Sequence, residues 1–409
     1  MKKISTHTHY YLKRWVTLSL SAVLVLGGFQ QCALLSQKSR SHQAQPDPAQ
    51  QGYVTSSLQH ITLIRAADQV DKNLLKFLEL FDVPHDGTIE GINKAMQAHF
   101  LRKPTQELRD MAPAVVTPDV QDQAYALLQA MGFIDEIPHT AVEADYFLLF
   151  GAFTTRKKTR FRDFLDQYQQ ELLRCKQLVL LGGIRYLRED EIADIQETLE
   201  KAGSSLPTFL QERHKWAAFQ QQLAQLRHNA QWLAALQYVP EQIQGLSLAG
   251  LSELLIQHKQ LPTALAHAKV LTETDAWYHL WAMYAPDVLK AAFQEGHNLI
   301  FVNDLKIGSE GVQRPNTKTT VEAWYYTYHP KPGHIHANVE KPYGIRMEKA
   351  LRTFLEGLPP EERGFSITWN SPAAHAQLDL AVYKDQLART FYQELLLRKA
   401  IASAVSKKV

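Results

Sequence analysis

The stretches "DYFLLFGA" (145–152) and "CKQLVLLGG" (175–183) decide the fold of this chain. Both are short apolar runs that end in glycine, and the segment between them, "RFRDFLDQYQQELL", has helical periodicity. Three further runs of strand length follow at 297–304, 333–340 and 364–370, separated by helical patterns. Continuous apolar runs suit strands that are buried on both faces. The sequence therefore predicts an α/β fold, a Rossmann-like parallel sheet of about five strands with helices on both faces.

The sequence on either side of these strands predicts a helical region, a helical insertion and a linker. Residues 55–140 show helical periodicity broken by prolines and predict a helical N-terminal region. Residues 141–409 form the predicted Rossmann-like domain, with a helical insertion rich in Gln and Ala at about 206–260. For this insertion a packing role is favoured over a lid. Residues 35–54 are polar, contain two prolines and predict a flexible linker.

The N-terminal segment, residues 1–34, is predicted to be a membrane anchor or a signal segment. Four basic residues among the first fourteen precede the uncharged apolar stretch "WVTLSLSAVLVLGGF" (15–29). The basic flank predicts that the N-terminus stays in the cytoplasm and that the rest of the chain is exported. An uncleaved single-pass anchor is favoured, and a cleaved signal, which would give a secreted protein, is the alternative.

Composition excludes several classes of protein. The net charge of +2, together with 45% hydrophobic and 21% charged residues, describes a globular protein without the basic stripe of a nucleic-acid binder. Two cysteines, Cys32 and Cys175, exclude a disulfide framework and a four-cysteine zinc site. His334 and His336 share one face of a predicted strand, but no third ligand is evident, so no metal site is predicted.

Glycine and arginine recur just after the predicted strands. In an open α/β sheet, ligands bind at the carboxyl ends of the strands, so these loops are the first place to look for a site. Glycine lets the backbone N–H groups approach a ligand, and the guanidinium of arginine suits bidentate binding of phosphate or carboxylate. Ordinary turns with solvated arginines are the alternative. The candidate ligand-binding residues in these loops are Gly151, Arg160, Gly182, Gly183, Arg185, Tyr343 and Arg346.

Two predicted helix starts add candidates. In "GSEGVQRPNTKTTVEAW" (308–324), Asn316 or Thr317 is expected to cap a helix whose positive N-terminal end, together with Arg314, favours an anion. In "LTETDAW", Thr272 and Glu273 begin another helix. Glu273 is a candidate general base or ligand for a hydroxyl group, with a plain helix-dipole partner as the alternative.

These motifs occur in the order found in a bacterial family. "DYFLLFGA" with Arg160, "LVLLGGIR", "TETDAWYHLW", "RPNTKTTVEAW" and "ANVEKPYGIRMEKALRTF" resemble the SanA/YdcF/ElyC family over about 145–370. The resemblance implies a Rossmann-like domain of uncertain activity with links to the cell envelope, and a nucleotide-like or phosphorylated ligand. Asn338 and Glu340 stand where the family often offers Ser and a Tyr-His pair, so no catalytic residue is carried over.

Together these observations predict a protein of the bacterial inner membrane with its main domain in the periplasm. Its strand-end crevice is expected to bind a small, anionic, phosphate-bearing molecule, with a role in envelope metabolism. Whether it is an enzyme stays open. The alternative is a non-catalytic binding protein, or an exported factor that contacts a protein partner through the helical insertion. No nucleic-acid partner is expected.

Overall fold

A computed structural model describes most of the chain after residue 53. It covers residues 54–58, 61–65, 69–103, 106–183, 185–206, 208–209, 271–295, 297–304, 306–308, 311–313, 315–372 and 378–406. The predicted anchor and linker therefore lie outside the described residues, apart from Val54. So do Arg314 and nearly all of the predicted insertion. Within the described part of the chain, no helix is long and apolar enough to cross a membrane.

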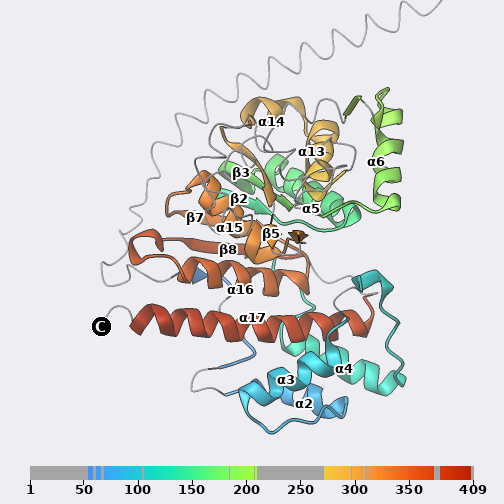
Figure 1. Ribbon diagram of the computed structural model, residues 1–409, viewed down its shortest axis with the longest axis vertical. Coiled ribbons are helices and arrows are strands. Elements are labelled where there is room, and N and C mark those ends of the chain that lie inside the picture. The colour runs from blue at the N-terminus through green and yellow to red at the C-terminus, as the bar shows by residue number, and fades with distance from the viewer. Residues whose placement is uncertain are drawn as a thin grey trace, which may run out of the picture. The chain divides into compact units, whose positions relative to one another are not determined.

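A parallel sheet forms the centre of the molecule (Figure 1). Its strands run in the order β1-β8-β7-β2-β3-β4, and every neighbouring pair is parallel. The five longer strands fall on the five predicted apolar runs, so the predicted α/β Rossmann-like fold is confirmed. The strands are β1 (Thr55–Ser56), β2 (Val142–Leu149), β3 (Leu173–Gly183), β4 (Leu299–Asp304), β7 (His334–Asn338) and β8 (Ser366–Asn370).

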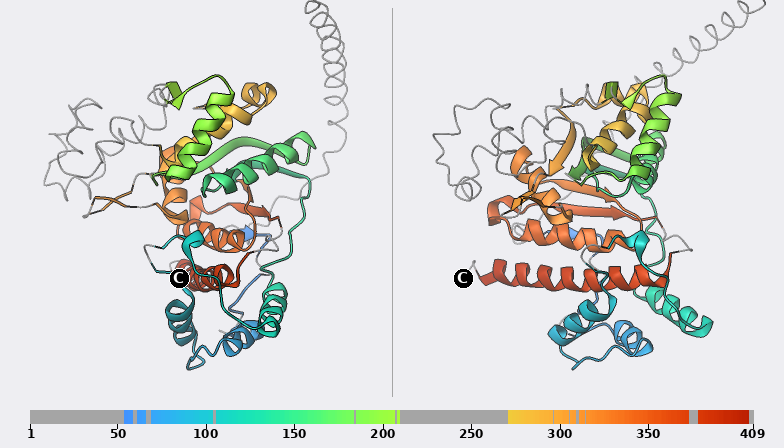
Figure 2. Two further views of the ribbon diagram at one scale, coloured as in Figure 1. Left: turned by 90° about the vertical axis from the view of Figure 1, so that its right-hand side faces the viewer. Right: turned by 45° about the vertical axis from the view of Figure 1, so that its right-hand side comes forward.

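Helices cover both faces of this sheet (Figure 2). Helices α5, α13 and α14 share one apolar core with the sheet, and α15, α16 and α17 share the other. The helices are α2 (Lys72–Leu80), α3 (Ile89–Phe100), α4 (Pro118–Ala130), α5 (Thr154–Gln169), α6 (Glu189–Lys201), α13 (Glu273–Tyr284), α14 (Asp287–Ala292), α15 (Thr317–Tyr328), α16 (Tyr343–Glu356) and α17 (Leu380–Ser406).

The strands are apolar without interruption because both of their faces are buried. In β2, Phe147 packs into the core beneath α5 and α13, while the next residue, Leu148, packs into the core beneath α15 and α16. In β3, Leu180 packs into the first of these two cores and Leu181 into the second. Successive side chains of a strand point to opposite faces, so a strand buried on both faces shows no polar alternation.

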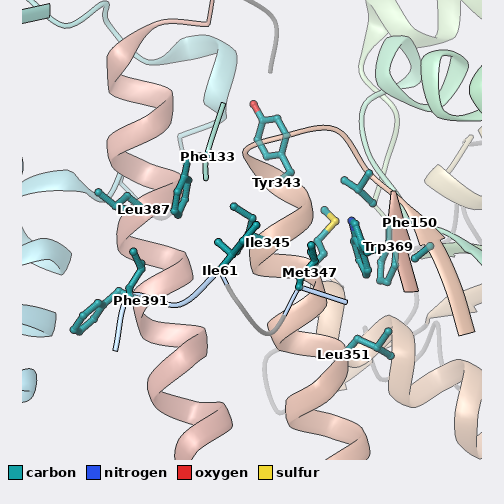
Figure 3. Close-up of a cluster of buried hydrophobic side chains, with 14 of the residues drawn as sticks. Ile61, Phe133, Phe150, Tyr343, Ile345, Met347, Leu351, Trp369, Leu387 and Phe391 are labelled. Carbon is teal, nitrogen blue, oxygen red and sulfur yellow. The ribbon is translucent and has the colours of Figure 1, made fainter. Parts of the chain in front are cut away.

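An additional layer lies beyond α16. Figure 3 shows that Ile345 points from α16 toward α17, whereas Met347 points from α16 toward Trp369 of the sheet. Helix α17 in turn packs against α3, so the N-terminal helices share a continuous core with the sheet domain. Helix α16 is therefore buried on two sides, and it begins at the carboxyl edge of the sheet.

The polar stretch at 308–324 contains more structure than the sequence predicts. Strands β5 (Lys306–Gly308) and β6 (Gly311–Gln313) pair antiparallel, with Gly308 opposite Gly311. Strands of three residues carry too few side chains to show a periodic pattern. This hairpin leads from β4 toward the start of α15, so the stretch is not a simple surface loop.

Candidate functional site

A cavity of about 510 Å³ lies at the carboxyl edge of the sheet. Strands β2 and β7 are neighbours there, although their connections run to opposite sides of the sheet. Such a switch point is where open α/β sheets bind ligands. The walls come from the residues after β2, from the starts of α13, α15 and α16, from α17, and from two short stretches, 101–102 and 107–108. Distant parts of the chain thus meet around one space.

Eight of the twelve predicted site residues line this cavity. They are Gly151, Arg160, Arg185, Glu273, Asn316, Thr317, Tyr343 and Arg346. Gly182, Gly183 and Thr272 lie beside it without lining it, and Arg314 lies outside the described residues. The loops chosen from the sequence therefore do converge, as the topology of a parallel sheet requires.

The glycines serve close packing between elements. A Cβ on Gly182 would lie 2.8 Å from Thr274 Oγ1, and one on Gly183 would lie 2.4 Å from Pro315 Cγ. A Cβ on Gly151 would lie 2.7 Å from an oxygen of Glu273. The strand ends therefore need glycine so that the starts of α13 and α15 can approach. For Gly182 and Gly183 this role differs from the predicted approach of a ligand.

The two predicted helix starts are confirmed as capped. Asn316 is the N-cap of α15, and its Oδ1 accepts hydrogen bonds from the backbone N–H groups of Lys318 and Thr319 at 3.0 and 3.1 Å. Thr272 is the N-cap of α13, and its hydroxyl donates to Asp275 Oδ2 at 2.9 Å. Asn316 faces the cavity with Thr317, so the positive end of α15 is directed at this space.

Arginine dominates the polar lining of the cavity. Six arginines line it, against two carboxylates, Glu107 and Glu273, among the described residues of its wall. The arginines are Arg102, Arg156, Arg160, Arg185, Arg346 and Arg389. Their hydrogen-bond partners differ, and these partners decide which of them remain able to bind a ligand.

The guanidinium of Arg160 forms hydrogen bonds within the protein. Its Nε and Nη2 donate to the two carboxylate oxygens of Glu340 at 2.7 and 3.0 Å, and its Nη1 donates to the carbonyl oxygens of Phe150 and Gly151 at 2.7 and 3.0 Å. This buried ion pair joins the end of β2 to the end of β7 across the switch point. Arg156 approaches the same carboxylate at 3.8 Å and lies over the ring of Tyr343 at 4.1 Å.

Arg185 is also held in place. Its Nη1 and Nη2 donate to the carboxylate of Glu191 at 2.8 and 3.0 Å, and its guanidinium lies 5.0 Å from the ring centre of Phe153. Burial raises the pKa of the Glu191 carboxyl, but hydrogen bonds and charge from Arg185, with backbone N–H donors, outweigh this and lower that pKa to about 2. Glu191 is therefore a fixed anion that holds Arg185.

Most of the Arg346 guanidinium has no hydrogen-bond partner among the described residues. Its Nε donates to Gln386 Oε1 at 3.2 Å, and neither of its Nη groups donates to any residue that the structure describes. Burial lowers the pKa of Arg346 to about 10, and the charges of Arg389 and Arg102 act in the same direction while Asp385 opposes them. Arg346 still carries its charge at neutral pH.

Two other arginines lie near Arg346 and bond to the same carboxylate, that of Asp385. The buried carboxylate of Asp385 accepts from Arg102 Nη1 and from Arg389 Nε, both at 3.0 Å. One carboxylate thus serves two arginines, with Arg346 beside them. We call Arg102, Arg346 and Arg389 the basic end of the cavity, and the positive charges of these residues attract an anion.

Glu273 stands on the other side of the sheet edge, at the start of α13. Its Oε1 lies 3.8 Å from Lys157 Nζ and 3.9 Å from Arg185 Nε, and its carboxylate accepts no hydrogen bond from any described residue. Lys157 is fully buried and donates to the backbone oxygen of Glu273 at 2.8 Å. Burial lowers the pKa of Lys157 to about 7, against the raising effect of Glu273.

The histidines on β7 bond within the sheet. His334 Nε2 and His336 Nδ1 both lie within hydrogen-bond distance of Thr368 Oγ1, at 2.8 and 2.7 Å. Burial lowers the pKa of His336 to about 3. Over the described ranges, no group of three or more His, Cys, Asp or Glu side chains is arranged to hold a metal ion.

Several lining residues were missed by sequence reasoning. Arg102 comes from the N-terminal region, and Gln386 and Arg389 come from α17, outside the βα repeats that guided the prediction. A weak signal exists: Asp385 and Arg389 are spaced i, i+4, as an ion pair on one helix face would be. The spacing does not show that this face meets a cavity.

Comparison with known proteins identifies no relative. The chain matches no protein-family model, no curated protein and no solved structure.

Proposed function

We propose that this protein binds a small anionic, phosphate-bearing molecule in the cavity at the carboxyl edge of the sheet. The observation that carries the proposal is Arg346, a charged residue of the cavity lining whose two Nη groups have no partner among the described residues. Its side chain is partly buried, and a partly buried cation without a hydrogen-bonded counter-ion is costly, so a bound anion removes that cost.

The surroundings of Arg346 favour phosphate over other anions. Arg102 and Arg389 add two charges that share the single carboxylate of Asp385. The capped start of α15, with Thr317 in the lining, adds the partial positive charge of a helix N-terminus. Several donors in one cavity wall suit a group with three or more acceptor oxygens and more than one negative charge.

The proposal concerns binding and assigns no reaction. Nucleophilic catalysis needs a nucleophile hydrogen-bonded to a base, and no such pair is found among the described residues of the cavity wall. The N-terminal segment adds the proposal that the protein is anchored in the bacterial inner membrane with this domain in the periplasm, which rests on the basic and apolar pattern of residues 1–34.

Calorimetric titration of the full-length chain with inorganic phosphate and pyrophosphate tests the proposal. Arg346→Met should weaken binding about tenfold or more, because a hydrogen-bonded charge pair is lost. Arg162→Met is the matched control, since Arg162 lies exposed on α5 away from the cavity, and its affinity should stay at the wild-type value. Absence of binding to wild type, or equal affinities in wild type and Arg346→Met, would refute the proposal.

A further inference from the structure

The cavity contains a second group without a hydrogen-bond partner, of opposite character to Arg346. The carboxylate oxygens of Glu273 accept no hydrogen bond from a described residue, yet they line the same space. Glu273 begins α13, whose core lies on one face of the sheet, whereas Arg346 lies on α16 at the other face. No ion pair joins the two side chains, so a ligand spanning the cavity meets donors at one end and an acceptor at the other.

Charge is distributed unevenly between these ends. At the basic end, Asp385 is the hydrogen-bonded carboxylate for Arg102 and Arg389. At the other end, which we call the acidic end, Glu107 and Glu273 line the cavity near Arg185, and Arg185 is paired with Glu191. A ligand with an anion at both ends would meet repulsion from Glu273, so the second end of the ligand is uncharged or positive.

A neutral hydroxyl group fits the acidic end better than an ammonium group. The Glu273 carboxylate already has two cations close to Oε1, the amine of Lys157 at 3.8 Å and the guanidinium of Arg185 at 3.9 Å. A third positive charge there would be repelled by both. A hydroxyl donates a hydrogen bond to the carboxylate without adding charge, and a bond to an ionised acceptor is among the stronger ones.

The aromatic rings of the wall leave little room for stacking a nucleobase. Arg156 covers one face of the Tyr343 ring at 4.1 Å, and Arg185 lies over the ring of Phe153 at 5.0 Å. Phe150 is buried and packs against Trp369 with ring centres 5.6 Å apart (Figure 3). Base recognition commonly uses an open aromatic face, and each of these rings has at least one such contact within the protein.

From this arrangement we infer that the ligand is a phosphorylated polyol, such as a sugar phosphate, with its phosphate at Arg346 and a hydroxyl group donating to Glu273. The inference rests on the proposed function and adds the class of molecule and its orientation. The cavity volume of about 510 Å³ lies within the usual range for small-molecule sites.

The test compares three probes on the full-length chain by calorimetric titration: inorganic phosphate, a panel of glycerol 3-phosphate, ribose 5-phosphate and glucose 6-phosphate, and AMP. At least one polyol phosphate should bind about tenfold or more tightly than inorganic phosphate, because the hydroxyl contact with Glu273 adds to the phosphate contact. AMP should not exceed the best polyol phosphate.

Two variants separate the ends of the ligand. Glu273→Gln keeps the size of the side chain and should remove the advantage of the polyol phosphate over inorganic phosphate. Its affinity for inorganic phosphate should be unchanged or higher, because the negative charge of the Glu273 carboxylate is lost. Arg346→Met should weaken the binding of inorganic phosphate and of the polyol phosphate by a similar factor. Arg389→Gln serves as a second variant at the basic end should Arg346→Met fail to fold, which circular dichroism will show.

The outcomes distinguish the inference from the proposed function. If inorganic phosphate binds through Arg346 but every polyol phosphate binds equally well in wild type and Glu273→Gln, the inference fails while the proposed function stands. Tighter binding of AMP than of all three polyol phosphates also overturns the inference. If none of the probes binds, both fail together.

Discussion

At the residue scale, Lys157 shows how burial beside the cavity changes the chemistry of a side chain. Its amine is fully buried, and its pKa is lowered to about 7. The unfolded chain keeps this proton up to the ordinary lysine pKa, so between these two values the unfolded state binds more protons than the folded state. The free energy of unfolding therefore rises with pH across this window and is lowest below the folded-state pKa.

The predicted contribution of Lys157 is a gain on the order of 2 kcal/mol in unfolding free energy from pH 7 to pH 9. Urea denaturation at several pH values measures it. Lys341 also titrates in this range, with a pKa lowered to about 8, so the informative quantity is the difference between wild type and Lys157→Met. That difference should grow with pH.

Lys158→Met, which removes the adjacent lysine paired with Asp194, is the matched control. The unfolding free energy of this variant should depend on pH in the same way as that of wild type. The account of Lys157 is wrong if Lys157→Met and wild type show the same dependence.

Single residues also mark how far the sequence predicts the site. Arg346 and Glu273 are found from sequence because they follow strand ends and helix starts that the sequence itself reveals. The neighbouring sequence does not show whether either side chain has a hydrogen-bond partner in the folded protein. Arg160 and Arg346 look alike in sequence. Arg160, however, donates to Glu340 and to two carbonyl oxygens, whereas Arg346 donates only to Gln386 among the residues that the structure describes.

At the scale of elements, the glycine at the end of β3 sets how closely α15 begins to the sheet. A Cβ added to Gly183 would lie 2.4 Å from Pro315 Cγ and 3.2 Å from the carbonyl oxygen of Asp304. Gly183→Ala should therefore lower the unfolding free energy by about 1–3 kcal/mol, as over-packing does. Chemical denaturation measures the loss.

A double-mutant cycle supplies the control for Gly183. Pro315→Ala removes the Cγ atom that the new methyl group meets, so Gly183→Ala should cost less in that background than in wild type. Relief should be partial, because Pro315→Ala keeps the Cβ atom, which would lie 2.8 Å from the new methyl group, and the contact with the Asp304 carbonyl remains. Equal costs in both backgrounds would show that Pro315 does not set this approach.

The five long strands were predictable because they are continuous apolar runs of the right length. Other elements gave weaker signals. Strand β1 has two residues and β5 and β6 have three each, too few for a period to show. Helix α17 contacts both α16 and α3, so apolar side chains surround much of it and blur the one-sided pattern of a surface helix.

At the scale of the whole molecule, the cavity is a product of topology. The order β8-β7-β2-β3-β4 brings the ends of β2 and β7 together, and that half of the site follows from strand and helix alternation. The other half does not, because Arg102 and Arg389 reach the cavity from the N-terminal region and from α17. The buried carboxylate of Asp385 fastens these two parts together.

Binding of an anion at Arg346 inside this cavity can be observed directly by crystallography. Crystals of the full-length chain soaked in tungstate, a heavy analogue of phosphate, reveal the bound anion by anomalous scattering. We expect a peak in the cavity with oxygens about 2.7–3.2 Å from the Nη atoms of Arg346, and loss of this peak in Arg346→Met crystals. An empty cavity, or a peak that persists in Arg346→Met, would show that Arg346 does not bind an anion here.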